Sequence, residues 1–370
     1  MSSGRDRVLL PGTPSLGRLY VRAAAAAAGR VLPTGRRPGR RHDRESSAAT
    51  LPAVEHVAEG VGVEGPRHEA FCRTVGAPLR EGPGGTEVFP GHLHALAFPV
   101  AMSVLTRPDF PLPVLGMVHL ANEVELLRPV AVGEELTVTA WAERLRPHRS
   151  GAQVDVVARL SGPDGHAVWT GRSTYLSKGV RVPGPVPEAP RRDFHPPVPT
   201  ALWRLPAGTG RDYAAVSGDW NPIHLSAAGA RALGMERAIA HGMYSASRAL
   251  AEAGVPAGTP LRWTVEFAAP VPLPATVAVA FSDDGRGPAW RRSEYAGWDP
   301  RRRRPHFTGG VERLGARTAP GPDRPGFPTA PGRGHAEPGS RAGLEDPGGP
   351  VRRRPPPRGP QWSGEPTAEH

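Results

Sequence analysis

The chain has 370 residues, too many for one small core and enough for two domains of ordinary size. Its net charge is +11, but residues 1–50 and 285–370 each carry +7, which leaves −3 for residues 51–284. The single cysteine, Cys72, excludes an intramolecular disulfide and a cysteine-based metal site. No apolar run reaches membrane-spanning length, so we expect a cytoplasmic protein that does not bind membranes.

Both ends of the chain are rich in Arg, and residues 316–370 also contain few apolar residues, a composition typical of disorder. We predict disordered tails at residues 1–50 and 316–370, with at most one short helix near residues 19–28. Basic tails also suit nucleic acid, but regularly interleaved aromatic residues and zinc or helix-turn-helix signatures are lacking. We therefore expect no nucleic-acid partner.

Residues 51–178 predict one helix followed by several strands. The apolar stretch HALAFPVAMSVLT (94–106) predicts a buried helix with Pro99 in its first turn. Alternation of apolar and polar residues then predicts strands at 118–127, 135–143, 152–160 and 166–177. A helix followed by antiparallel strands favours a sheet curled around that helix.

A proline-rich stretch, residues 179–200, predicts an extended linker. After it, residues 201–315 repeat the earlier order. A strand at 202–205 precedes a polar loop, and then come a helix and more strands at 240–253, 262–267 and 275–281.

The two halves also share residues. VELLRPVAVGEELTV (124–138) matches VEFAAPVPLPATVAV (265–279) at an offset of 141, which indicates a duplicated domain. The predicted helices align at an offset near 143, which sets Phe98 against His241. The second half should then end in two more strands. Residues 305–314 are a faint counterpart of the last strand of the first half, whereas residues 285–304 do not alternate and leave the penultimate strand unplaced.

The polar loop of the second half holds most of the chemistry. Within YAAVSGDWNPIHLSAAGA (213–230), Asp219 and His224 are five residues apart. Gly218 before the pair and Asn221 with Pro222 within it force a tight backbone. A carboxylate and an imidazole that face one cavity can act as general acid and base on a water and a carbon acid.

The patterns YxxVSGDxNPIH (213–224) and IAHGM (239–243) together resemble the signature of MaoC-like dehydratases and R-specific enoyl-CoA hydratases. The resemblance implies an α+β double hot-dog fold, in which two tandem halves each wrap an antiparallel sheet around a long helix. It also implies a hydro-lyase that hydrates 2-enoyl thioesters and dehydrates (3R)-3-hydroxyacyl thioesters. The substrate would carry its own CoA or acyl-carrier-protein phosphopantetheine, and no other cofactor and no metal is expected.

The resemblance assigns Asp219 and His224 as the catalytic pair. The backbone N–H of Gly242 is expected to stabilise the thioester oxyanion, because it lies at the start of the predicted helix. Four further residues are expected to support the loop or to orient Asp219: Ser217, Gly218, Asn221 and His241. Alternatively, an Asp after a Gly is a turn residue and His241 is a structural group.

The first half lacks this motif, so we expect it to shape an acyl-chain pocket. Phe98, Pro99 and Met102 would line that pocket or pack the helix. Arginines 237, 248 and 262 are candidates for contact with CoA phosphates, or are ordinary surface residues. A homodimer through exposed sheet edges is plausible.

Two other functions remain open. One is a hot-dog thioesterase, although thioester hydrolysis does not need the protonation of an α-carbon that Asp219 and His224 would serve. The other is a catalytically inactive protein that binds acyl thioesters or stabilises a partner subunit. The irregular stretch 285–304 favours this second alternative, because a damaged last sheet would leave an inactive product.

Overall fold

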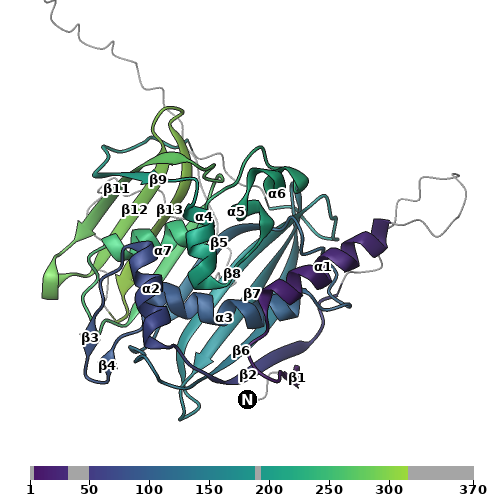
Figure 1. The fold of residues 1–370 in the computed structure, drawn as a ribbon, viewed down its shortest axis with the longest axis horizontal. Helices are drawn as coiled ribbons and strands as arrows, with labels where there is room; N and C mark the ends of the chain where they lie inside the picture. Colours follow the sequence, from purple (N-terminus) through teal and green to yellow (C-terminus); the bar gives the residue numbers. More distant parts are fainter. Residues whose placement is uncertain (1–3, 32–49, 188–192, 316–370) are drawn as a thin grey trace, which may run out of the picture. The chain divides into compact units, whose positions relative to one another are not determined.

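The computed structural model describes residues 4–31, 50–187 and 193–315. The first half contains two longer helices and five long strands: β2 (Val54–Val61), α2 (Gly65–Val75), α3 (Pro90–Leu105), β5 (Val118–Leu126), β6 (Leu136–His148), β7 (Gly151–Ser161) and β8 (Ala167–Lys178). Between α2 and α3 lies a small hairpin of β3 (Glu81–Gly82) and β4 (Gly85–Thr86). Figure 1 shows α3 lying across the strands of this half.

The second half begins after the predicted linker and repeats the same order. Its elements are β9 (Ala201–Leu205), α4 (Thr209–Ser217), α5 (Pro222–Leu225), α6 (Ala227–Ala232), α7 (Gly242–Glu252), β10 (Leu261–Phe267), β11 (Ala275–Asp284), a 3₁₀ turn (Gly287–Ala289), β12 (Arg292–Asp299) and β13 (Arg304–Arg313). No helix of the described residues is long and apolar enough to span a membrane.

A further strand, β1 (Asp6–Leu9), precedes the first half. One eleven-stranded sheet joins the halves, in the order β1-β2-β6-β7-β8-β5-β10-β13-β12-β11-β9. The order is mirrored about the antiparallel pair β5 and β10, where Glu123 lies opposite Thr264. These two residues are equivalent at the offset of 141. The two copies of the duplicated domain therefore meet at equivalent strands, one on each side of this pair. The predicted α+β double hot-dog fold, with a helix wrapped by each antiparallel half-sheet, is confirmed.

The start of α3 differs from the prediction. The helix begins at Pro90 rather than at residue 94, so Pro99 lies in its interior and not in its first turn. The Pro-Gly pair at 90–91 looks like a turn in sequence, but proline is also favoured at the first helical position. The helices therefore start 152 residues apart, and Phe89, not Phe98, is the counterpart of His241.

The stretch 285–304 contains the penultimate strand that the sequence pattern left unplaced. Strand β12 pairs with both β11 and β13, so the second sheet is complete. The alternation is lost because both faces of β12 are covered: Tyr295 belongs to the main core, whereas Ala296 and Trp298 pack with Phe194 on the other face. A strand that is buried on both faces does not alternate. The reason for suspecting a damaged sheet therefore disappears.

The prediction that residues 1–50 form a disordered tail is wrong for the described part of this segment. β1 (Asp6–Leu9) pairs in parallel with β2, and α1 (Leu16–Val31) packs on the core through Leu16, Leu19 and Ala23. These three side chains follow a helical spacing, which the abundant Arg and Ala obscure. Residues 32–49, and the whole predicted tail 316–370, lie outside the described residues.

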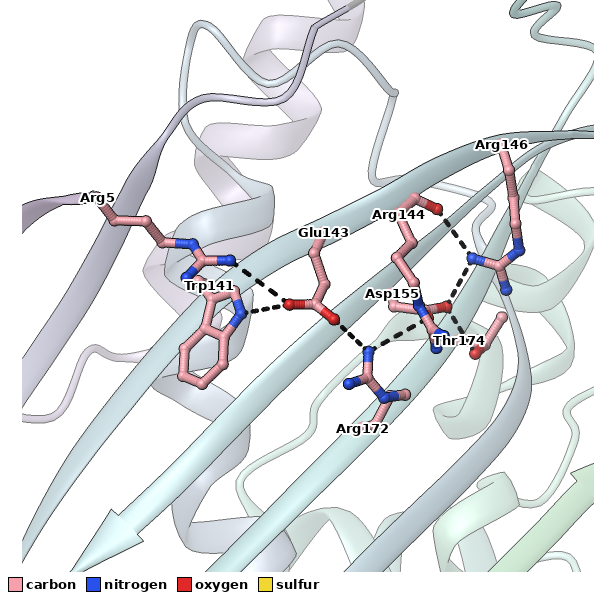
Figure 2. A network of polar contacts seen from close by, with 8 residues as sticks. All are labelled: Arg5, Trp141, Glu143, Arg144, Arg146, Asp155, Arg172 and Thr174. Atoms are coloured by element: carbon pink, nitrogen blue, oxygen red, sulfur yellow. Dashed lines mark hydrogen bonds and ion pairs between the residues drawn. The ribbon is translucent and has the colours of Figure 1, made fainter. Parts of the chain in front are cut away.

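A charged network lies on strands β6, β7 and β8 (Figure 2). Asp155 is fully buried, and its carboxylate accepts hydrogen bonds from Arg144, Arg146 and Thr174. Arg172 bridges from Asp155 to Glu143, which also accepts a hydrogen bond from the indole of Trp141. Burial alone would raise the pKa of Asp155, but Arg146 and the hydrogen bonds outweigh it and lower that pKa.

Candidate active site

The backbone between α4 and α5 places the predicted acid. Helix α4 ends at Ser217 and is capped by Gly218, whose φ of +78° is a left-handed conformation that favours glycine. The side chain of Asn221 caps α5 by accepting a hydrogen bond from the N–H of Ile223. Ser217 donates to the carbonyl of Tyr213 and accepts from the N–H of Asp219. The loop therefore holds Asp219 between two helix ends.

The carboxylate of Asp219 has one engaged and one free oxygen. Oδ1 accepts hydrogen bonds from the Tyr20 hydroxyl at 2.6 Å and from the N–H of Asn221 at 3.3 Å. Oδ2 lies 3.7 Å from Nε2 of His241, which is longer than a hydrogen bond. Within the described residues, no hydrogen bond ends on Oδ2. This oxygen is therefore available to a ligand.

His224 is buried and neutral. Its Nδ1 donates to the carbonyl of Ile239 at 2.9 Å, because a carbonyl can only accept, and this leaves a lone pair on Nε2. Burial, together with the neighbouring His241, lowers the pKa of His224 to about 3. The imidazole is therefore a hydrogen-bond acceptor at neutral pH.

His241 joins the pair to the start of α7. Its Nε2 donates to the backbone carbonyl of Asp219 at 2.9 Å, and its ring stacks on that of His224 with centroids 3.6 Å apart. Burial lowers its pKa to about 4. Helix α7 begins at the next residue, Gly242, whose N–H has no acceptor within the helix. A Cβ on Gly242 would lie 3.0 Å from the ring of Phe267, which accounts for the glycine.

These residues open onto a cavity of about 610 Å³, hereafter the cavity, whose volume suits a small-molecule ligand. Of the seven predicted site residues, Gly218 does not line the cavity. The other six do: Ser217, Asp219, Asn221, His224, His241 and Gly242. Of the predicted acyl-pocket residues, Phe98 and Met102 line the cavity and Pro99 does not. The predicted arginines at positions 237, 248 and 262 are not among its lining residues either.

Sequence reasoning missed several residues of the cavity. Tyr20 comes from the supposed tail, 199 residues from Asp219. His94 and His119 lie among the apolar groups of the first half, and burial lowers their pKa values to about 4 and about 3. Arg149, Lys178 and Arg304 add positive charge to the lining. No local pattern could have brought these residues together, because each belongs to a different element.

Three groups of the site could also hold a metal ion. The ligand atoms of Asp219, His224 and His241 all lie within 4.8 Å of one another. Two imidazoles and a carboxylate suit zinc or iron. The hydrogen bonds described above nevertheless occupy one nitrogen of each histidine. The absence of a metal stays a prediction.

Gly210→Ala is expected to lower kcat by about 100-fold, because misplacing a reacting group by about 1 Å can cost that much. A Cβ on Gly210, in the first turn of α4, would overlap the backbone carbonyl oxygen of His224. Steady-state kinetics test this. The matched control is Gly208→Ala, where the nearest atom would be Oδ2 of Asp212 at 3.5 Å. Equal kinetics for the two variants would contradict the prediction.

Comparisons with known proteins agree with this architecture. The sequence profile described as MaoC like domain matches residues 188–295. The chain is 35% identical over 233 residues to 3-hydroxyacyl-thioester dehydratase X of Mycobacterium tuberculosis, which covers 62% of this chain and 80% of that protein.

Solved structures show the same fold. A crystal structure of HtdX from Mycobacterium tuberculosis has a TM-score of 0.59 and 32% identity, and the match covers 70% of this chain and 100% of that one. A MaoC-like dehydratase from Phytophthora capsici has a TM-score of 0.54 and covers 71% of this chain and 95% of its own. At 19% identity, this second likeness concerns the fold alone.

Proposed function

Since this chain belongs to the family of MaoC-like dehydratases and is a hydro-lyase, we propose that it interconverts 2-enoyl thioesters and (3R)-3-hydroxyacyl thioesters. The observation that carries the proposal is that Asp219 and His224 lie close together in the lining of one cavity, which Gly242 at the start of α7 also lines. The thioester would be carried by CoA or an acyl carrier protein. No cofactor beyond that arm is needed.

The pair would work through a single water. A carboxylate oxygen of Asp219 and a ring nitrogen of His224 lie within 4.8 Å of each other. One water between them can therefore contact both residues at hydrogen-bond lengths of about 2.8 Å. In hydration, the water oxygen bonds to C3 and one water proton passes to the pair. The same proton then passes to C2, so the pair ends unchanged. Dehydration runs these steps in reverse.

The negative charge that develops on the thioester oxygen needs a donor. Gly242 lines the cavity and is the first residue of α7, so its N–H lies at a helix N-terminus, where the dipole favours negative charge. One such preorganised donor typically contributes about 3–4 kcal/mol to the transition state. Gly242 is thus proposed as the oxyanion hole, through its backbone only.

The rest of the cavity suits the two ends of a thioester substrate. Part of its first-half lining is apolar: Phe98, Met102, Leu105, Val114 and Met117. Arg149 lies in the turn between β6 and β7, Lys178 ends β8, and Arg304 starts β13. These three positions lie at the same end of the strands. Gly151 pairs with Lys178 there, and Phe267 pairs with Phe307. We propose that the phosphates of the CoA or phosphopantetheine arm bind at this end of the sheet, near Arg149, Lys178 and Arg304.

Arg304→Ala is expected to raise KM for an enoyl-CoA about five- to tenfold and to leave kcat nearly unchanged. Arg304 would bind the arm equally in the ground and transition states, and loss of such uniform binding appears in KM. Kinetics at low salt measure the effect, since salt screens exposed charges. Arg237→Ala is the control, because Arg237 is exposed and outside the cavity lining. If KM increased only in Arg237→Ala, the phosphates of the arm would bind near Arg237 and not near Arg304.

Hydration of crotonyl-CoA and longer 2-enoyl-CoAs, followed by loss of the enoyl absorbance, tests the proposed function. Release of free thiol is measured in the same samples. Hydration without thiol release supports the proposal. Thiol release without hydration would indicate a thioesterase, and neither reaction on any acyl chain would indicate the inactive binding protein.

A homodimer remains a proposal. The outermost strands of the sheet, β1 and β9, carry exposed Leu9 and Leu202, and unpaired edges favour pairing with a second chain. The molar mass from light scattering distinguishes a dimer from a monomer.

A further inference from the structure

The described N-terminal segment, β1 and α1, lies outside both hot-dog halves but packs against the candidate active site. Strand β1 extends the sheet beyond β2, and α1 is anchored by the buried side chains of Leu16 and Leu19. A Cβ on Gly218 would lie 3.7 Å from Cδ1 of Leu16, so the helix rests on the loop that holds Asp219. The segment is therefore part of the wall around the site.

Tyr20 connects this segment to the proposed acid–base pair. Its hydroxyl donates to Oδ1 of Asp219 at 2.6 Å and also interacts with the side chain of Asn221. The ring is half-buried and lines the cavity. Burial and the negative charge of Asp219 raise the pKa of Tyr20, so the phenol stays a neutral donor.

We propose that Tyr20 is a positioning residue: by holding Oδ1 of Asp219, its hydroxyl presents Oδ2 to the reacting water. This inference rests on the proposed function. It stands on the division of the carboxylate already described, with both hydrogen bonds on Oδ1 and none on Oδ2. A hydrogen bond to a charged carboxylate is short and strong, so it can fix the rotation of the group. The N-terminal segment thus completes a site whose proposed acid–base pair lies in the second half.

Tyr20→Phe keeps the ring and removes only the hydroxyl. We expect kcat for enoyl-CoA hydration to fall about tenfold while KM changes less than twofold, because Tyr20 acts through Asp219 and not through substrate affinity. A purely structural role would not produce this split between kcat and KM. Tyr244→Phe is the matched control: Tyr244 is buried on α7, accepts a hydrogen bond from Arg248 and does not line the cavity.

A crystal structure of Tyr20→Phe supplies a readout that does not depend on turnover. A rotated or doubled Asp219 carboxylate supports the positioning role, even if the wild type hydrates no enoyl-CoA and the proposed function fails. An unchanged carboxylate would overturn the inference. If the wild type is active, a Tyr20→Phe kcat equal to that of the wild type would also overturn it. A higher kcat would do the same and would show instead that α1 obstructs the site.

Discussion

Asp219→Asn and His224→Gln are each expected to lower kcat for enoyl-CoA hydration by about 10²–10⁴-fold, the usual contribution of general acid–base catalysis. The asparagine keeps the shape of the carboxylate but cannot accept a proton. The glutamine has no lone-pair nitrogen at the position of Nε2. Each change removes one of the two groups that would contact the water, so both losses should be large and should appear in kcat.

Loss of enoyl absorbance measures the effect, and circular dichroism shows that the variants stay folded. Asp212→Asn and His166→Gln are matched controls, since both residues are exposed and outside the cavity lining. Either site variant with wild-type kcat would refute the proposed pair. Activity that is abolished equally in the controls would show that the losses do not come from the site.

His224 also makes the stability of the folded chain depend on pH. The pKa of His224 is about 3 in the folded chain and about 6.5 ordinarily, so below pH 6.5 the unfolded chain binds a proton that the folded chain does not. Stability should therefore fall as pH drops from 6.5 towards 3. His224→Gln removes this contribution and should make the free energy of unfolding less sensitive to acid over that interval.

Asp155→Asn is expected to lower the free energy of unfolding by about 3 kcal/mol. Removing one partner of a buried ion pair typically costs about 3–5 kcal/mol, because the remaining charge is left uncompensated. Here three guanidinium groups would lose their shared carboxylate: Arg144, Arg146 and Arg172. We expect the lower end of the range, since these arginine side chains are 26–37% exposed and stay partly hydrated.

Urea denaturation monitored by tryptophan fluorescence measures this loss. Asp109→Asn is the control: Asp109 pairs with Arg107 but is 53% exposed, so its loss should cost less than about 1 kcal/mol. Because Arg146 and the hydrogen bonds hold the pKa of Asp155 below its ordinary value, its contribution is present above about pH 3.8 and is lost as pH falls through the folded pKa. Equal losses in the two variants would contradict the buried network.

Local patterns in the chain carried most of the fold prediction. The antiparallel strands appeared as alternating residues, and the repeat at an offset of 141 predicted a duplicated domain. The pairing of the equivalent residues Glu123 and Thr264 was shown only by the structure. The elements that the sequence patterns missed have separate local causes. β12 is buried on both faces and so does not alternate, and α3 starts with a Pro-Gly pair that locally looks like a turn.

The candidate site divides in the same way. Asp219, His224 and the glycine at the start of α7 could be chosen from sequence because they lie in two short motifs, where spacing along the chain sets spacing in space. Tyr20 could not, because its contact with Asp219 spans 199 residues and depends on how α1 packs on the core. Asp155 likewise finds its arginines only when β6, β7 and β8 pair. Short-range periodicity and turn chemistry are written into the chain, whereas contacts between distant segments arise only when the sheet closes around its helices and burial brings those side chains together.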